Sequence, residues 1–182
     1  PFSNMNSDVS RENILVLAYD YMASNIKCGW AGDMYHFNQR YIYGGTDNGN
    51  DGIVVIPSAY DMFEDNDLRK QDWMLIGPQY NYDTGEPVVG TSEYTGQPLV
   101  FVKDIKRYSE GDTITSTMYT GEENSGARFN KYNPGPLSDE NYYGNDWVLY
   151  RLTEIYFDKA EALMRKNGNV ATQEAVDLIN AC

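Results

Sequence analysis

Apolar side chains recur with helical spacing along one long stretch of the chain, residues 146–163. Steps of three and four separate the apolar positions, so they share one face of a helix. These positions are Leu149, Leu152, Tyr156, Ala160 and Leu163. Arg151 and Glu154 stand three positions apart, and we expect them to pair on the surface of this helix.

A second periodic piece follows Gly168 and Asn169, with Ala175, Val176 and Ile179 as its apolar positions. Two amphipathic helices joined by a short turn that contains glycine are typical of an antiparallel helical hairpin. Residues 146–182 are therefore predicted to form such a hairpin.

The part of the chain before this hairpin alternates short apolar runs with turn-forming residues. The pattern predicts a helical turn within 59–65 and short strands within 53–56, 73–76, 99–103 and 113–119. The run from Ile14 to Tyr19 fits either a buried strand or a helix segment, because periodicity does not separate the two over so few residues.

Gly, Pro, Asn, Thr and Ser interrupt residues 77–145 every few positions. Loops of this length in a compact domain are frequently functional. The sequence thus predicts one domain, in which residues 1–145 form a loop-rich ligand-binding region and residues 146–182 form the hairpin.

The chain carries a net charge of −13, from 27 acidic and 14 basic residues. Nucleic acids and anionic lipids are both bound through clustered basic residues, so we expect neither as a partner. No apolar run approaches the roughly 20 residues of a membrane span. Because aliphatic residues are scarce, the 16 tyrosines and 3 tryptophans must supply much of the core.

The two cysteines, Cys28 and Cys182, lie far apart, and neither belongs to a Cys-x-x-Cys pair. A disulfide between them stays open on this pattern. Two buried free thiols are the state we expect.

The C-terminal stretch also carries a specific set of residues. They are Asn145, Asp146, Arg151, Leu152, Glu154, Tyr156, Ala160, Glu161, Ala162, Ile179 and Asn180. This set resembles the C-terminal signature of the SusD/RagB family, glycan-binding surface lipoproteins of Bacteroidetes. Three further stretches are similar to family elements: the strand-like 12–15, the segment with Phe63, Asp67 and Arg69, and the pair Lys131-Tyr132. Leu68 stands where the family often has proline.

The resemblance implies a mostly α fold, in which tetratricopeptide-like helical hairpins support a large loop-rich region containing short β-strands. It implies a non-enzymatic protein that binds oligosaccharides or polysaccharides at the bacterial cell outer membrane for delivery to a SusC-like TonB-dependent transporter. Family members are several times longer than the hairpin. We therefore expect the N-terminal half and the lipid anchor to lie outside this chain.

The residue types needed to hold a sugar without cleaving it gather between residues 30 and 43. Flat apolar rings stack on the C–H face of a sugar, while amide, carboxylate and guanidinium groups bind its hydroxyls. The rings are Trp30, Tyr35, Tyr41 and Tyr43, and the polar groups are Asp33, Asn38, Gln39 and Arg40. Trp73 and the run Gln79–Asp83 repeat this character. The competing interpretation is that these aromatic residues fill the core.

Other chemistries find little support. The acidic loop 47–52 fails the spacing of an EF-hand, since Gly49 stands where an oxygen ligand is needed and Ser58 stands where a glutamate is needed. One histidine, His36, excludes a His-rich zinc site, and no Gly-x-Ser-x-Gly elbow is present. The 27 acidic residues leave open a carboxylate pair for glycoside hydrolysis, but the family resemblance argues against it. We expect no cofactor and no metal.

The alternative to glycan binding is that the chain is a protein- or peptide-interaction subunit of the same kind of uptake complex.

Overall fold

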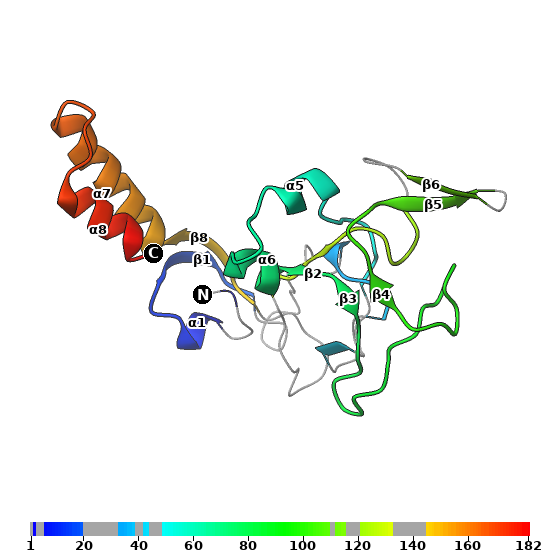
Figure 1. Cartoon of the computed structure of the whole chain (residues 1–182). Coiled ribbons are helices and arrows are strands. Elements are labelled where there is room, and N and C mark those ends of the chain that lie inside the picture. Colours follow the sequence, from blue (N-terminus) through cyan, green and yellow to red (C-terminus); the bar gives the residue numbers. More distant parts are fainter. Residues whose placement is uncertain are drawn as a thin grey trace.

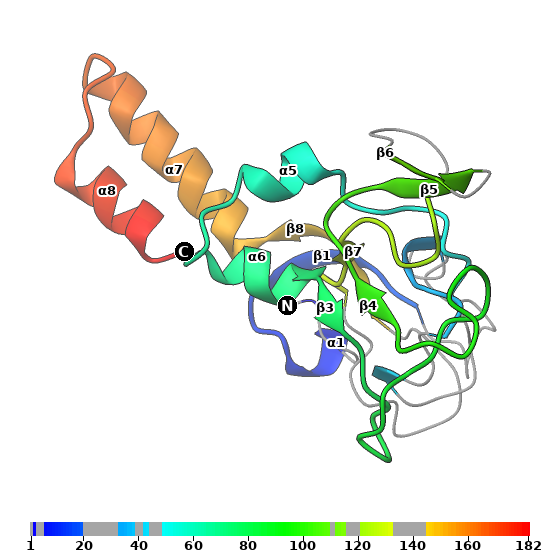
Figure 2. The same ribbon diagram turned by 45° about the vertical axis from the view of Figure 1, so that its right-hand side comes forward.

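The computed structural model describes residues 2, 6–19, 33–38, 42–43, 49–109, 112–115, 121–132 and 145–182. A helical hairpin projects from a body of short strands and irregular chain (Figure 1). The same projection is visible after a 45° turn (Figure 2).

The hairpin consists of α7 (Leu152–Lys166) and α8 (Gln173–Asn180), which confirms the predicted pair of helices. Gly168 closes α7 with a φ of 67°, and the N–H of Asn169 donates to the carbonyl of Met164 at 2.9 Å. This is the 6→1 hydrogen bond of a Schellman motif, which ends a helix. The hydroxyl of Thr172 then accepts from the N–H of Ala175 at 3.1 Å and caps α8.

Small side chains let the two helices approach each other. Ala160 in α7 and Ala175 in α8 are both buried, whereas Ile179, predicted to be on the apolar face, is half exposed. Lys159 and Glu174 form an ion pair of 2.8 Å between the helices.

The expectation that the first helix begins near residue 147 is wrong. Residues Trp147–Arg151 form strand β8, which pairs antiparallel with β1 (Asn13–Leu17). Aromatic and branched side chains favour extended backbone here, and β1 supplies hydrogen-bond partners that a local pattern does not reveal. The open question about the run beginning at Ile14 is therefore answered in favour of a strand.

Arg151 accordingly has a different partner from the one predicted. Its guanidinium lies 2.6 Å from the carboxylate of Glu12 rather than against Glu154, because it stands at the end of a strand and not on a helix. The hydroxyl of Thr153 also accepts from Arg151, at 3.0 Å.

Helix α1 (Asn6–Val9) joins the start of the chain to β8. The side-chain amide of Asn6 donates to the carbonyl of Asp146 at 3.0 Å, and its oxygen accepts from the N–H of Asp146 at 2.7 Å. Asn145 likewise donates to the carbonyl of Phe2 at 2.9 Å. Two residues of the family signature thus hold the N-terminal segment in place.

Within the described residues, the body contains two short helices and three two-stranded sheets. The helices are α5 (Pro57–Asp61) and α6 (Leu68–Trp73). The sheets pair β2 (Met74–Leu75) with β7 (Arg128–Phe129), β3 (Gly77–Pro78) with β4 (Val100–Phe101), and β5 (Lys106–Ser109) with β6 (Asp112–Thr115).

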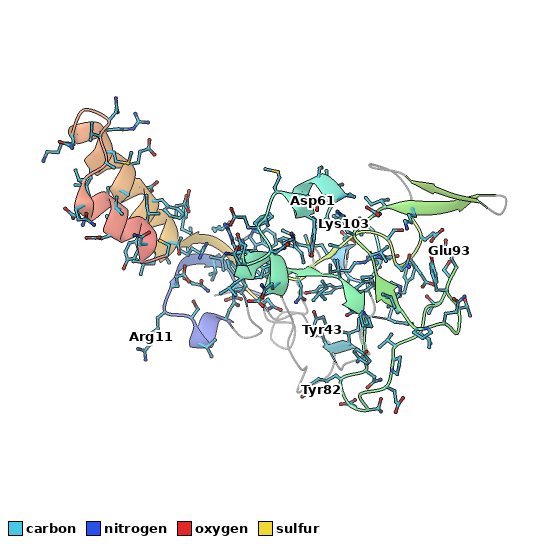
Figure 3. All side chains as sticks on the ribbon, viewed as in Figure 1. Arg11, Tyr43, Asp61, Tyr82, Glu93 and Lys103 are labelled. Carbon is cyan, nitrogen blue, oxygen red and sulfur yellow. The ribbon has the colours of Figure 1, made fainter. Side chains whose placement is uncertain are left out.

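The predicted strands at 73–76, 99–103 and 113–119 thus appear as shorter strands, and the last is described only to Thr115. The predicted strand at 53–56 is reduced to one bridge between Val55 and Ala127. Asp61 and Lys103 tie α5 to the segment after β4 through an ion pair of 2.9 Å (Figure 3).

The expectation of a mostly α fold holds only for the hairpin. In the body, frequent Gly and Pro residues keep the described helices and strands to six residues or fewer. Core packing there depends on Val88, Leu99 and Phe101, with a separate cluster around Tyr35. Cys182 is exposed, against the expectation of a buried thiol, and Cys28 lies outside the described residues.

Candidate functional site

Two of the predicted site residues lie in the interior. Tyr35 is 1% exposed, and its hydroxyl donates a hydrogen bond of 2.5 Å to the carbonyl of Tyr132. Asn38 is also buried, and its amide donates to the carbonyl of Val89 at 2.5 Å. In this arrangement both side chains support the fold of their segment.

Asp33 is exposed, and its carboxylate accepts from the amide of Asn50 at 3.0 Å. Trp30, Arg40 and Tyr41 lie outside the described residues, as does Gln39. Their place in a ligand site stays a prediction.

Tyr43 and Trp73, which are distant in sequence, meet through Asn130. The hydroxyl of Tyr43 donates to the side-chain oxygen of Asn130. The backbone N–H of Asn130 donates to the carbonyl of Trp73 at 2.7 Å, and its amide donates to the carbonyl of Asp72 at 3.1 Å. The tertiary structure therefore links Tyr43 to Trp73, two residues that the sequence placed in separate candidate stretches.

A cavity of about 880 Å³ lies where α6, β8 and the helical hairpin meet, and we call it the junction cavity. Its lining residues include Phe2, Trp73, Asn130, Lys131, Phe157 and Ile179. Trp73 stands edge-on to Phe2, with ring centroids 5.8 Å apart and an interplanar angle of 89°. The volume lies within the range of roughly 300–1,000 Å³ that small-molecule sites occupy.

Charged groups complete the wall of the junction cavity. Arg69 pairs with Asp67 at 2.5 Å, and Arg151 pairs with Glu12 at 2.6 Å. An aromatic surface beside hydrogen-bonding groups is the combination that orients a polar ligand with an apolar face.

A second aromatic surface lies on the turn between β3 and β4. Tyr80 and Tyr82 are 53% and 55% exposed, and Figure 3 shows Tyr82 at the outer part of this turn. The side chain of Asn81 accepts from the N–H groups of Asp83 and Thr84, at 2.9 and 3.1 Å. This bonding is ordinary turn chemistry, and it leaves both rings open to solvent.

Sequence reasoning missed a buried ionic cluster of His36, Asp51, Glu123 and Arg128. Arg128 forms an ion pair with Asp51 and donates to the carbonyl of Glu123 at 2.5 Å. His36 Nε2 lies 3.1 Å from the carboxylate of Glu123. Glu123 and Arg128 lie five positions apart, but His36 and Asp51 come from other stretches of the chain, so no local spacing predicts the cluster.

The loop after Val89 closes over the same carboxylate. Glu123 accepts from the backbone N–H groups of Thr91, Ser92 and Tyr94, at 2.8, 3.0 and 2.8 Å. Burial alone would raise the pKa of Glu123, but these donors together hold the pKa below its usual value.

Burial dominates the protonation of the other members. It lowers the pKa of His36 to about 4, with Arg128 adding to the effect and Glu123 opposing it. It raises the pKa of Asp51 to about 7 although Arg128 favours the carboxylate. Removal of either partner of the buried Arg128–Asp51 pair would leave the other buried without its partner.

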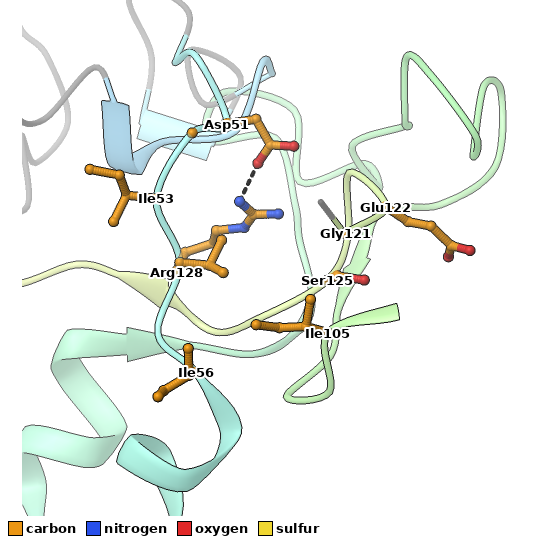
Figure 4. Close-up of a pocket in the computed structure, with 10 residues that line it drawn as sticks. Asp51, Ile53, Ile56, Ile105, Gly121, Glu122, Ser125 and Arg128 are labelled. Atoms are coloured by element: carbon orange, nitrogen blue, oxygen red, sulfur yellow. Dashed lines mark hydrogen bonds and ion pairs between the residues drawn. The ribbon is translucent and has the colours of Figure 1, made fainter. Parts of the chain in front are cut away.

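A cavity of about 640 Å³ opens beside this pair (Figure 4). Ile53, Ile56 and Ile105 give it apolar walls, and Glu122 and Ser125 also line it. Both terminal nitrogens of Arg128 donate hydrogen bonds within the protein, one to Asp51 and one to the carbonyl of Glu123. The Arg128–Asp51 pair therefore stabilises the cavity wall.

Among the described residues, no group of three or more His, Cys, Asp or Glu side chains is arranged to hold a metal ion. Asn50 and Asp51 of the acidic loop are used in contacts with Asp33 and Arg128. Within the part of the chain that the structure describes, no helix is long and apolar enough to cross a membrane.

The junction cavity is open to solvent and combines an indole with charged groups, which is the kind of lining that small-molecule sites have. A family model described as the SusD family matches residues 16–182, and the chain belongs to that family. No curated protein and no solved structure matches the chain.

Membership carries several consequences. SusD-family proteins bind without catalysing a reaction, so this chain is not an enzyme. Members bind glycans as partners of SusC-like transporters and are surface lipoproteins of the outer membrane.

Proposed function

We propose that this chain binds oligosaccharides at the bacterial surface and passes them to a SusC-like TonB-dependent transporter. The observation that carries the proposal is the junction cavity, where the ring of Trp73 stands beside hydrogen-bonding groups. Family membership supports the same assignment.

In this proposal one sugar ring lies against Trp73, and its hydroxyls bind the polar wall of the cavity. Arg69 and Asp67 present a planar ion pair at that wall, and Asp72 adds an exposed carboxylate. Stacking and hydroxyl hydrogen bonds give modest affinity, on the order of −4 to −8 kcal/mol, or millimolar to micromolar dissociation constants. Such affinity suits a protein that must release its ligand.

The 30–43 segment extends the proposed surface. Trp30, Arg40 and Tyr41 contribute rings and a guanidinium, and Tyr43 joins the segment to the cavity through Asn130. Asp33 binds hydroxyls from its exposed position, while the buried Tyr35 and Asn38 hold the segment in place.

The test is affinity for a panel of oligosaccharides, measured by calorimetry on the whole chain. We expect Trp73→Ala to weaken binding at least tenfold, because a buried tryptophan contact is commonly worth 2 kcal/mol or more. Trp30→Ala should weaken it as well. Val170→Ala, at an exposed position in the turn of the hairpin, is the control and should bind as the wild type does.

Wild-type affinity in both the Trp73 and Trp30 variants would show that the site lies elsewhere. Tyr82→Ala then distinguishes the exposed turn as the alternative surface.

The rival function, a protein or peptide contact without glycan binding, is favoured by one observation. The β1–β8 ribbon exposes apolar side chains at Ile14, Leu15, Leu17, Leu149 and Tyr150. Co-purification with the transporter and a glycan array separate the two functions. Retention of glycans without transporter supports capture, and transporter binding alone supports the rival.

A further inference from the structure

The ammonium group of Lys131 lies between two aromatic rings at the edge of the junction cavity. Its nitrogen is 4.3 Å from the ring centroid of Phe2 and 5.1 Å from that of Trp73. Among the described residues, no carboxylate or other hydrogen-bonding group reaches this nitrogen. Lys131 is therefore a cation with ring partners and without an anionic one in that part of the chain.

The other cations of the cavity differ from Lys131 in this respect. Arg69 is paired with Asp67, and Arg151 is paired with Glu12. Asp72 also lines the cavity, but no ion pair joins it to Lys131. Within the described residues of the wall, the charge of Lys131 is thus left for a ligand.

The surroundings of Lys131 disfavour its charged form. Partial burial lowers the pKa of Lys131, and the nearby guanidinium of Arg151 lowers it further. The two rings offset part of this cost, since a cation over an aromatic face is attracted by the electrons of the ring. An anion beside the nitrogen would favour the charged form of Lys131 and offset the rest of this cost.

A second, smaller cavity of about 280 Å³ shares Phe2, Lys131 and Phe157 with the junction cavity. Lys131 therefore lines both cavities.

We propose that the junction cavity selects acidic oligosaccharides, with a carboxylate or sulfate group on Lys131 and the adjoining sugar ring against Trp73. This inference rests on the proposed glycan binding and specifies the class of glycan. The acidic group of the ligand binds Lys131 and orients the glycan, while the indole of Trp73 stacks on the sugar ring. A neutral glycan of the same shape makes only the second of these contacts.

The net charge of −13 does not oppose this selection at short range. At physiological salt the screening length is about 8 Å, so most surface carboxylates are screened from the ligand. A contact with the half-buried ammonium is screened much less.

The test uses pairs of ligands that differ only in charge. Oligogalacturonides and their methyl esters share every ring and hydroxyl, and a sulfated oligosaccharide with its desulfated form makes the second pair. Calorimetry with the whole chain at physiological salt should show at least tenfold tighter binding of the charged member of one pair. The pair that shows it distinguishes carboxylate from sulfate.

Lys131→Met keeps the length of the side chain and its contact with the rings but removes the charge. Affinity for the acidic ligand should fall roughly ten- to hundredfold, to the value of the neutral ligand, as expected for one lost charged hydrogen bond. Lys131→Arg should retain most of the preference. Lys103→Met, at a lysine paired with Asp61 outside the cavity, should leave both affinities unchanged.

Equal binding of charged and neutral ligands to the wild type would overturn the selection while leaving glycan binding intact. Failure of the wild type to bind any glycan would overturn the proposed function as well. Because these comparisons need no variant, they decide the question even if Lys131→Met does not fold.

Discussion

His36 shows at the scale of a single residue how burial changes chemistry. The imidazole is fully buried between the carboxylate of Glu123 and the ring of Phe101, whose centroid lies 5.7 Å away. Burial lowers the pKa of His36 to about 4. The folded protein therefore keeps the ring neutral at pH values where the unfolded chain already binds a proton.

This shift makes stability depend on pH. Because the folded pKa is about 4 and the usual value is 6.5, the unfolded state binds more protons between these limits. The contribution is present above pH 6.5 and is lost as the pH falls toward 4. Relative to His36→Gln, the wild type should lose about 2–3 kcal/mol of unfolding free energy over this range.

Urea unfolding of both proteins at several pH values measures the difference. Subtracting the variant removes the opposite contribution of Asp51, whose raised pKa of about 7 favours the folded state at low pH. A constant difference between pH 4 and 6.5 would mean that His36 is protonated equally in both states.

The turn of the helical hairpin shows at the scale of an element how one residue joins two helices. Gly168 and Asn169 both have left-handed backbone, with φ of 67° and 64°. Glycine adopts this conformation without strain, and asparagine tolerates it better than most residues. The sequence pair Gly-Asn thus decides both where α7 ends and in which direction the chain returns.

Gly168→Ala should destabilise the protein by about 1 kcal/mol, since a Cβ atom is strained at this φ. The added carbon would meet no atom within 4 Å, so the cost is conformational and not a clash. Thermal unfolding measures the change. Gly52→Ala is the matched control, because that glycine has no left-handed φ and its Cβ would make only ordinary contact. Equal effects of the two substitutions would contradict this account.

Segments from both ends of the chain are joined at the scale of the whole molecule. Asn6 binds both backbone polar groups of Asp146, and β1 pairs with β8. Phe2 packs against Trp73 and Tyr132, with centroids 5.8 and 5.2 Å apart. The junction cavity therefore exists only when the N-terminal segment is in place.

Asn6→Ala should lower the unfolding free energy by about 2–3 kcal/mol, because it leaves the buried N–H and carbonyl of Asp146 without this partner. Urea unfolding measures the loss, and Asn66→Ala, at an exposed position, should change little. A loss below about 0.5 kcal/mol would show that water replaces the amide at Asp146.

Local patterns predicted only part of this architecture. The helical hairpin was predictable because apolar spacing and a Gly-containing turn act over a few residues. Strand β8 was not, since Trp147 to Arg151 also fit a helical face and only pairing with β1 makes them extended. The candidate site was also predictable only in part. The sequence identified both aromatic residues as candidates, but only the tertiary structure shows that Trp73 lines a cavity and that Tyr35 is buried.

The sequence by itself determined the family, the hairpin and the aromatic and amide character of the candidate site. The tertiary structure alone decided that Arg151 pairs with Glu12 and that Arg128 and Asp51 form a buried pair. It also decided that Lys131 lies over two rings with no carboxylate partner in the described part of the chain. The physical reason is the range of each interaction. Helix spacing and turn chemistry act between near neighbours, whereas burial and pairing depend on residues far away along the chain.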